Sequence, residues 1–91
     1  MNLEKLVAKY VSSAEHVLEE LEVAENMKVD TDQVGKVLEQ AKLYLEDAKY
    51  YRDKGKLDVS LTSVAYCEGL LDALKLLGAV SFEWPTKKRK K

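Results

Sequence analysis

The chain has 91 residues, of which 46% are hydrophobic and 34% charged, and its net charge is −1. This length suits one domain, the composition excludes a disordered chain, and no apolar run approaches the roughly 18 residues of a membrane span. Because there is one cysteine, Cys67, and no secretory signal is evident at residues 1–5, we expect a cytoplasmic protein without internal disulfides, zinc or membrane contact.

The first predicted element is an amphipathic helix over residues 3–25. Its apolar residues recur at alternating steps of three and four, which places them on one stripe that faces a core. The stripe consists of Leu3, Leu6, Val7, Tyr10, Ala14, Val17, Leu18, Leu21 and Ala24.

A second helix is predicted over residues 31–54. Asp30 is placed to accept a hydrogen bond from the backbone N–H of Gln33, which favours a helix start, and Gly55 supplies the left-handed residue that ends one. Leu43 and Tyr50 lie opposite the apolar stripe of this helix, one heptad apart, and are predicted to point outward.

A third helix is predicted over residues 58–77, with Asp58 as its cap and Gly78 at its end. Two of its sides are apolar. We expect the first row to face the core and to include Val59, Ser63, Tyr66, Leu70, Ala73 and Leu77, with buried Cys67 beside it. We expect the second row to point outward and to consist of Leu57, Leu61, Val64 and Leu71.

The connections between these helices are short, which favours antiparallel neighbours. The sequence therefore predicts an all-α fold, an up-down-up antiparallel three-helix bundle over residues 1–78, followed by a short non-helical tail over residues 79–91. A helix that is apolar on two sides must be covered twice. Two alternatives remain for what covers the second apolar side: a second copy of the chain, or the tail, with Val80, Phe82 and Trp84 folded back.

Catalytic and metal-binding patterns are sparse. The only histidine, His16, falls on the polar side of the first helix, and Glu68 and Asp72 are four residues apart without further ligands at a recognisable spacing. We find no phosphate-binding loop or nucleophile motif, and we expect neither an enzyme nor a cofactor nor a metal.

The tail ends in five consecutive basic residues, so the preceding 86 residues carry a net charge of −6. A basic end with aromatic residues upstream can attract phosphate and stack on bases, although the acidic body opposes it. The candidate nucleic-acid contacts are Trp84, Lys87, Lys88, Arg89, Lys90 and Lys91.

The stretch from Ala41 to Tyr51, together with Gly55 and the Tyr-x-Glu-Gly-Leu-Leu-Asp-Ala-Leu run at residues 66–74, resembles a family of small archaeal helical proteins. That family is the domain of unknown function numbered 357. The resemblance covers the chain up to Gly78 and implies an archaeal, cytoplasmic, all-helical domain with no catalytic residues to carry over. Its motif contains a candidate polar or ligand site between the second and third helices, for which a hydrogen-bonded helix contact is the alternative: Asp47, Tyr51, Tyr66, Glu68 and Asp72.

The leading hypothesis is a non-enzymatic helical interaction module that self-associates, with a dimer favoured, through the outward faces of the second and third helices. The alternatives are a nucleic-acid or nucleotide-associated accessory protein that uses the tail, and an enzyme or small-ligand binder between these two helices. A protein partner of another kind also stays open. The expected interface consists of Leu43, Tyr50, Leu57, Leu61, Val64 and Leu71.

Overall fold

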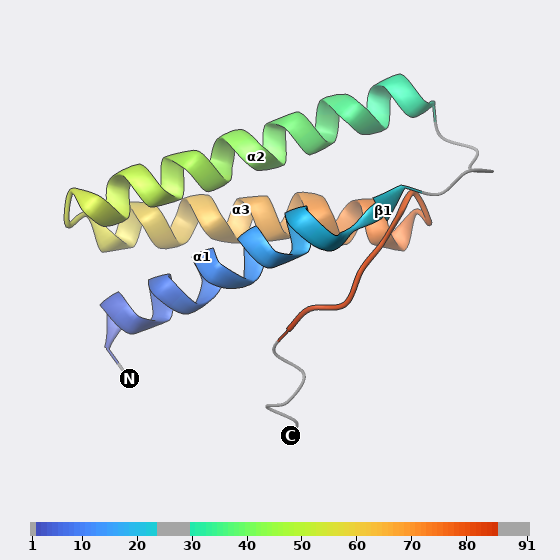
Figure 1. Ribbon diagram of the computed structural model, residues 1–91. Helices are drawn as coiled ribbons and strands as arrows, with labels where there is room; N and C mark the ends of the chain where they lie inside the picture. The colour runs from blue at the N-terminus through green and yellow to red at the C-terminus, as the bar shows by residue number, and fades with distance from the viewer. Residues whose placement is uncertain (1, 24–29, 86–91) are drawn as a thin grey trace.

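The computed structural model describes residues 2–23 and 30–85. Within these ranges the chain forms three helices and one small antiparallel sheet (Figure 1). The elements are α1 (Leu3–Glu20), β1 (Glu22–Val23), α2 (Thr31–Asp53), α3 (Leu57–Leu76) and β2 (Val80–Ser81). The all-α prediction is confirmed, with the two-stranded sheet as an addition. In Figure 1, α2 and α3 run in opposite directions on either side of a tight turn.

Helix α1 ends at Glu20, earlier than the predicted residue 25. Asn2 caps its start, because Oδ1 accepts a hydrogen bond of 2.7 Å from the Lys5 backbone N–H. At the other end, Leu21 is extended and the last turn has no basic residue to offset the negative end of the helix dipole. The chain instead pairs Glu22 with Ser81 and Val23 with Val80. Residues 24 and 25 lie outside the described ranges.

The second and third helices end where the glycines predict. Gly55 and Gly78 have φ angles of 79° and 77°, the left-handed conformation that glycine adopts at low cost. The predicted caps differ in detail. The Asp30 side chain accepts from the Asp32 backbone N–H at 3.2 Å rather than from Gln33. Helix α3 begins one residue early, at Leu57, so Asp58 lies inside it and is not the cap.

The core lies between the three helices, and α3 contributes five buried residues to it: Ser60, Val64, Cys67, Leu71 and Leu74. Leu57 and Leu61 are half-buried and pack against the same core. The prediction that Leu57, Leu61, Val64 and Leu71 form an outward row is therefore wrong, whereas the predicted burial of Cys67 is confirmed.

The physical reason is the size of the residues between the large ones. Ser60 and Cys67 lie on the Val64 and Leu71 side of α3, and small side chains allow helix backbones to approach closely. The Ser60 hydroxyl donates a hydrogen bond of 2.6 Å to the Ala48 carbonyl oxygen of α2. The side of α3 that carries Val59 and Tyr66 is left exposed.

The segment after α3, residues 79–85, folds back onto the helices, and we call it the strap. The Ala79 backbone N–H bonds to the Leu74 carbonyl oxygen at 2.9 Å, which reverses the chain, and β2 then pairs with β1. Ala79, Val80 and Phe82 are buried, and Trp84 packs against the core. The strap thus completes the core beside α1 and α3. None of the described helices has both the length and the apolar character that a membrane crossing requires.

Candidate interaction surface

The outer side of the α2–α3 pair carries large apolar side chains in contact with solvent. Leu43 and Tyr50 of α2 are 57% and 56% exposed, in agreement with their predicted outward direction. From α3 and the turn after it, Tyr66 and Leu77 are 53% and 62% exposed, and Val59 is also exposed. Val59, Tyr66 and Leu77 belong to the row that the sequence assigned to the core, so the face contains residues that the prediction missed.

Aromatic rings join the two helices on this side. The Tyr44 ring of α2 meets the Tyr66 ring of α3 edge to face, with centroids 4.5 Å apart and planes at 72°. Next to them along α2, the Tyr50 and Tyr51 rings are 5.1 Å apart, and the Lys54 ammonium lies 5.4 Å from the Tyr50 centroid. These contacts fix the rings while leaving Tyr66 and Tyr50 exposed, as in surfaces where tyrosines bind protein partners.

The row of α3 that carries Val59, Tyr66 and Leu77 contains no charged residue. The whole stretch from Val59 to Leu77 is described, and its charged residues are Glu68, Asp72 and Lys75. At 100° per residue these three fall on one side of the helix. That side is turned to the strap, since Asp72 bonds to Trp84 and the Lys75 ammonium lies 4.9 Å from the Phe82 centroid.

The five residues of the predicted polar site do not converge. Tyr66 lies on the outer side, against Tyr44, and Tyr51 lies against Tyr50. Glu68 and Asp72 lie on the strap side of α3, and Asp47 is exposed on α2. Positions 66 and 68 are about 200° apart on a helix, so their side chains diverge. The site predicted from Asp47, Tyr51, Tyr66, Glu68 and Asp72 is therefore divided between two surfaces.

A family model described as "Protein of unknown function (DUF357)" matches residues 9–80. The chain belongs to the DUF357 family. The resemblance seen in the sequence is thereby confirmed. No curated protein and no solved structure matches the chain. The matched range holds all of α2 and α3 and ends at Val80, the first residue of β2, whereas Phe82 and Trp84 of the strap lie beyond it.

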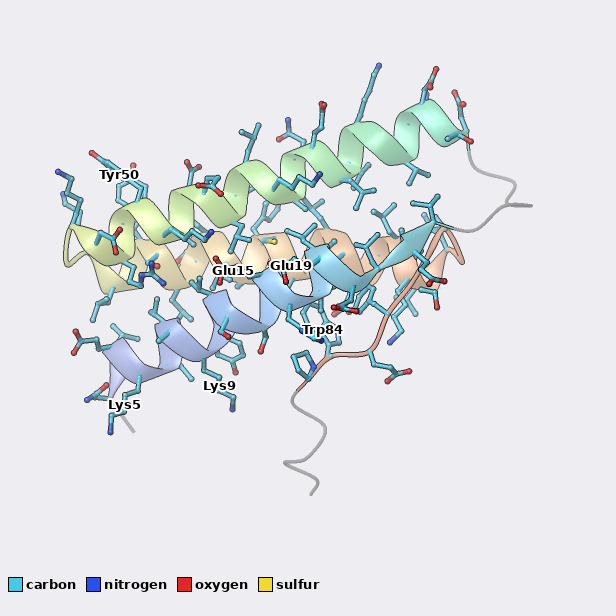
Figure 2. All side chains as sticks on the ribbon, in the orientation of Figure 1. Lys5, Lys9, Glu15, Glu19, Tyr50 and Trp84 are labelled. Atoms are coloured by element: carbon cyan, nitrogen blue, oxygen red, sulfur yellow. The ribbon has the colours of Figure 1, made fainter. Side chains whose placement is uncertain are left out.

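Beyond the matched DUF357 range, Trp84 is engaged within the fold. Its indole N–H donates a hydrogen bond of 2.7 Å to Asp72 Oδ1, and its ring meets the Phe82 ring with centroids 5.0 Å apart. Figure 2 shows the Trp84 side chain directed from the strap back towards the helices. A ring held in this way is not free to stack on a base. Residues 87–91, the other predicted nucleic-acid contacts, lie outside the described residues.

Two titratable groups of the DUF357 domain are perturbed beneath the strap side of α3. Burial, with a smaller contribution from the Asp72 charge, raises the pKa of Glu68 from 4.5 to about 7. Burial, with a contribution from Glu68, raises the pKa of the Cys67 thiol to about 11. Within the described residues no group of three or more histidine, cysteine or acidic side chains is arranged to hold a metal ion.

A second surface of the DUF357 domain is an open groove of about 290 Å³ between α1 and α2. Three of its charged groups pair with one another, since the Lys49 ammonium lies 2.5 Å from Glu15 and 3.7 Å from Glu46. The groove is lined by Glu15, Leu18, Glu19, Lys42, Leu45, Glu46 and Lys49. The Lys49–Glu15 ion pair ties α1 to α2, whereas the Lys49–Glu46 pair lies within α2. His16, about one turn before the end of α1, is exposed.

Proposed function

We propose that this DUF357 domain is a non-enzymatic interaction module that self-associates as a dimer through the outer face of α2 and α3. The residues that carry the proposal are Leu43, Tyr50, Val59, Tyr66 and Leu77, which are large, apolar and exposed. The proposal treats the chain as a cytoplasmic up-down-up bundle in which α2 and α3 present a common face. Exposed apolar groups of this size on one side of a small domain are typical of a protein-binding surface.

The size of the face supports a second copy as its occupant. With 20 residues, α3 is about 30 Å long, and packed helices lie about 8–10 Å apart. The interaxial distance plus one helix diameter of about 10 Å makes the pair about 18–20 Å wide, so its outer face offers roughly 500–600 Å² per copy. Two copies would bury about 1,000–1,200 Å² in total, which is the lower end of the range for specific interfaces. A two-fold pairing places like surfaces together, and the row of α3 with Val59, Tyr66 and Leu77 brings no charge that would repel its copy.

Gly69 supplies a further reason. It lies exposed in the middle of α3, where glycine costs about 0.5–1 kcal/mol relative to alanine. A Cβ atom added there would meet nothing within 4 Å, so the fold of the single chain does not require this glycine. A partner helix that approaches the α3 backbone closely would require it.

Size-exclusion chromatography with light scattering over a range of protein concentrations tests the proposal. We expect a dimer whose fraction rises with concentration and falls on substitution Tyr66→Glu, which places a charge at the centre of the face. His16→Glu, an exposed position on α1, is the matched control and should leave the dimer unchanged. A monomer at all concentrations would show that self-association is wrong.

Two glycine substitutions separate the interface from general helix effects. Gly69→Ala and Gly35→Ala both have room for the added methyl group and both raise helix propensity. We expect both to stabilise the monomer, but only Gly69→Ala to weaken the dimer, because Gly35 lies in the first turn of α2. Equal dimerisation of both variants would place the interface elsewhere.

A further inference from the structure

The strap is held to α3 by a small set of contacts near its aromatic residues. After Gly78 it runs back along α3, so that Phe82 lies over Lys75 and Trp84 reaches Asp72, about one turn closer to the middle of the helix. Its pairing with the rest of the fold is short, since β1 and β2 match over two residue pairs. A segment with few bonds of this kind opens more easily than a packed helix.

The next turn of α3 carries Glu68, which lies four residues before Asp72. Residues at this spacing are neighbours on a helix, so the two carboxyl groups lie on the same side of α3, where Trp84 of the strap contacts Asp72. Glu68 is half-buried and Asp72 is exposed. Asp72 accepts the Trp84 indole N–H, and this hydrogen bond holds its charge close to Glu68.

Other titratable groups lie on α3, on the strap and on α1. On α3, Lys75 lies one turn beyond Asp72, over Phe82. On the strap, Glu83 lies between the two aromatic residues. On α1, Glu15 forms an ion pair with Lys49 and therefore faces α2. Ser13 is buried and lies about 160° from Glu15 around the helix, so it is on the side of α1 that is turned away from α2. The titratable neighbours of Ser13 at helical spacing are Lys9, Tyr10, His16 and Glu20. Of all these charges, Asp72 is the one that shifts Glu68.

We propose that the strap is a proton-linked latch, closed over α3 while the Glu68–Asp72 pair keeps one proton and released when both carboxyl groups are ionised. Opening of the strap lets water reach Glu68 and separates Trp84 from Asp72. It also uncovers the apolar surface that Val80 and Phe82 bury, which then becomes available to another segment.

The direction of the effect follows from proton linkage. Glu68 has a pKa of about 7 in the closed state against an ordinary value of 4.5, so the closed state binds the proton more tightly than the open state. The contribution of Glu68 to closure is complete below about pH 4.5. It declines as the pH rises to about 7 and stays constant above that value.

Hydrogen exchange of the full-length protein, corrected for the pH dependence of intrinsic exchange, measures the opening directly. The reporting amides are those of residues 80–84, and amides 41–45 in the middle of α2 report global unfolding. One pKa unit corresponds to a tenfold change, and part of the Glu68 titration lies below pH 5, so we expect the strap opening constant to increase by about tenfold to seventyfold between pH 5 and pH 8. The α2 amides should not follow it.

Glu68→Gln removes the titration with little change in shape and should abolish this pH dependence. Glu39→Gln, an exposed position on α2, is the matched control and should retain it. Asp72→Asn keeps an oxygen acceptor for Trp84 but removes the charge, so it should shift the transition to lower pH. The latch is wrong if the wild-type strap shows no pH dependence, or if Glu68→Gln keeps it. If circular dichroism shows that Glu68→Gln is unfolded, Asp72→Asn becomes the deciding variant. An Asp72→Asn protein whose strap opens with the same pH midpoint as wild type would overturn the proposal.

Discussion

Trp84 and Asp72 are joined by a hydrogen bond of 2.7 Å between the indole nitrogen and Oδ1, across twelve positions of the chain. The bond connects the end of the strap to the middle of α3. It stands on the same side of α3 as Glu68, and about 120° around the helix from Tyr66 on the exposed face. Helix α3 therefore separates two surfaces with different chemistry, a titratable one under the strap and an uncharged one open to solvent.

Loss of the Trp84 N–H should weaken the fold slightly. In Trp84→Phe a ring still packs on Phe82, but the hydrogen bond to Asp72 is lost. Because Asp72 is exposed and water replaces the donor, we expect a decrease of about 0.5–1.5 kcal/mol in the free energy of unfolding, measured by urea denaturation. Asp72→Asn keeps an acceptor and should lose less. Identical midpoints for wild type and Trp84→Phe would contradict this account.

The corrected orientation of α3 gives a direct comparison of two leucines. Leu71 is fully buried, so Leu71→Ala should reduce the free energy of unfolding by about 2–5 kcal/mol. Leu43 is exposed on α2, and Leu43→Ala should change it by less than about 0.5 kcal/mol at concentrations where the chain is monomeric. Thermal unfolding followed by circular dichroism checks both. Similar losses for the two variants would mean that the faces are assigned incorrectly.

Ser60 and Thr62 form a second matched pair, since both donate a side-chain hydrogen bond to a backbone carbonyl. The Ser60 bond to Ala48 is buried and joins two helices, whereas the Thr62 bond to Asp58 is exposed and local. Ser60→Ala should therefore cost about 1–2 kcal/mol and Thr62→Ala less than about 0.5 kcal/mol in chemical denaturation. The order would be reversed if the exposed bond held the start of α3 in place.

Cys67 should resist alkylation in the folded protein. Burial raises its pKa from 9.0 to about 11, which lowers the thiolate fraction at pH 8 by about a hundredfold, and the side chain is fully buried. The rate of reaction with iodoacetamide should rise by at least about a hundredfold in concentrated urea. Glu68→Gln should lower the Cys67 pKa and accelerate the reaction in the folded state. Equal rates in buffer and in urea would show that Cys67 is accessible.

Periodicity and glycine placement predicted most of the fold. The α1 stripe faces the core from Val7 to Leu21, whereas Leu3 is exposed and Ala24 lies outside the described residues. Helix α2 buries one side, and Gly55 and Gly78 end their helices in the left-handed conformation. The end of α1 was not predictable locally. Glu22 and Val23 pair with Ser81 and Val80, which are almost sixty residues away in the sequence. Helix propensity depends on neighbouring residues and cannot predict a partner at this distance.

The surface of α3 was harder to predict because both of its sides are apolar. Hydrophobicity alone does not decide whether the side of α3 with Tyr66 or the side with Leu71 faces the core. The small residues decide it, Ser60 above all, because they let α2 approach closely. The divergence of Tyr66 and Glu68 was predictable, since residues two positions apart on a helix cannot share a site. The role of Trp84 was not, because its partner Asp72 is fixed by the reversal of the chain at Gly78.

The pairing of β1 with β2 has a consequence for the order in which the molecule comes apart. Because Glu22–Val23 is bonded to Val80–Ser81, the first helix is anchored at its far end by the last described segment of the chain. Truncation after Gly78 would therefore remove a support from the opposite terminus as well. The helical hairpin of α2 and α3, joined by a turn of three residues, has no such dependence on distant sequence and should be the last part to unravel.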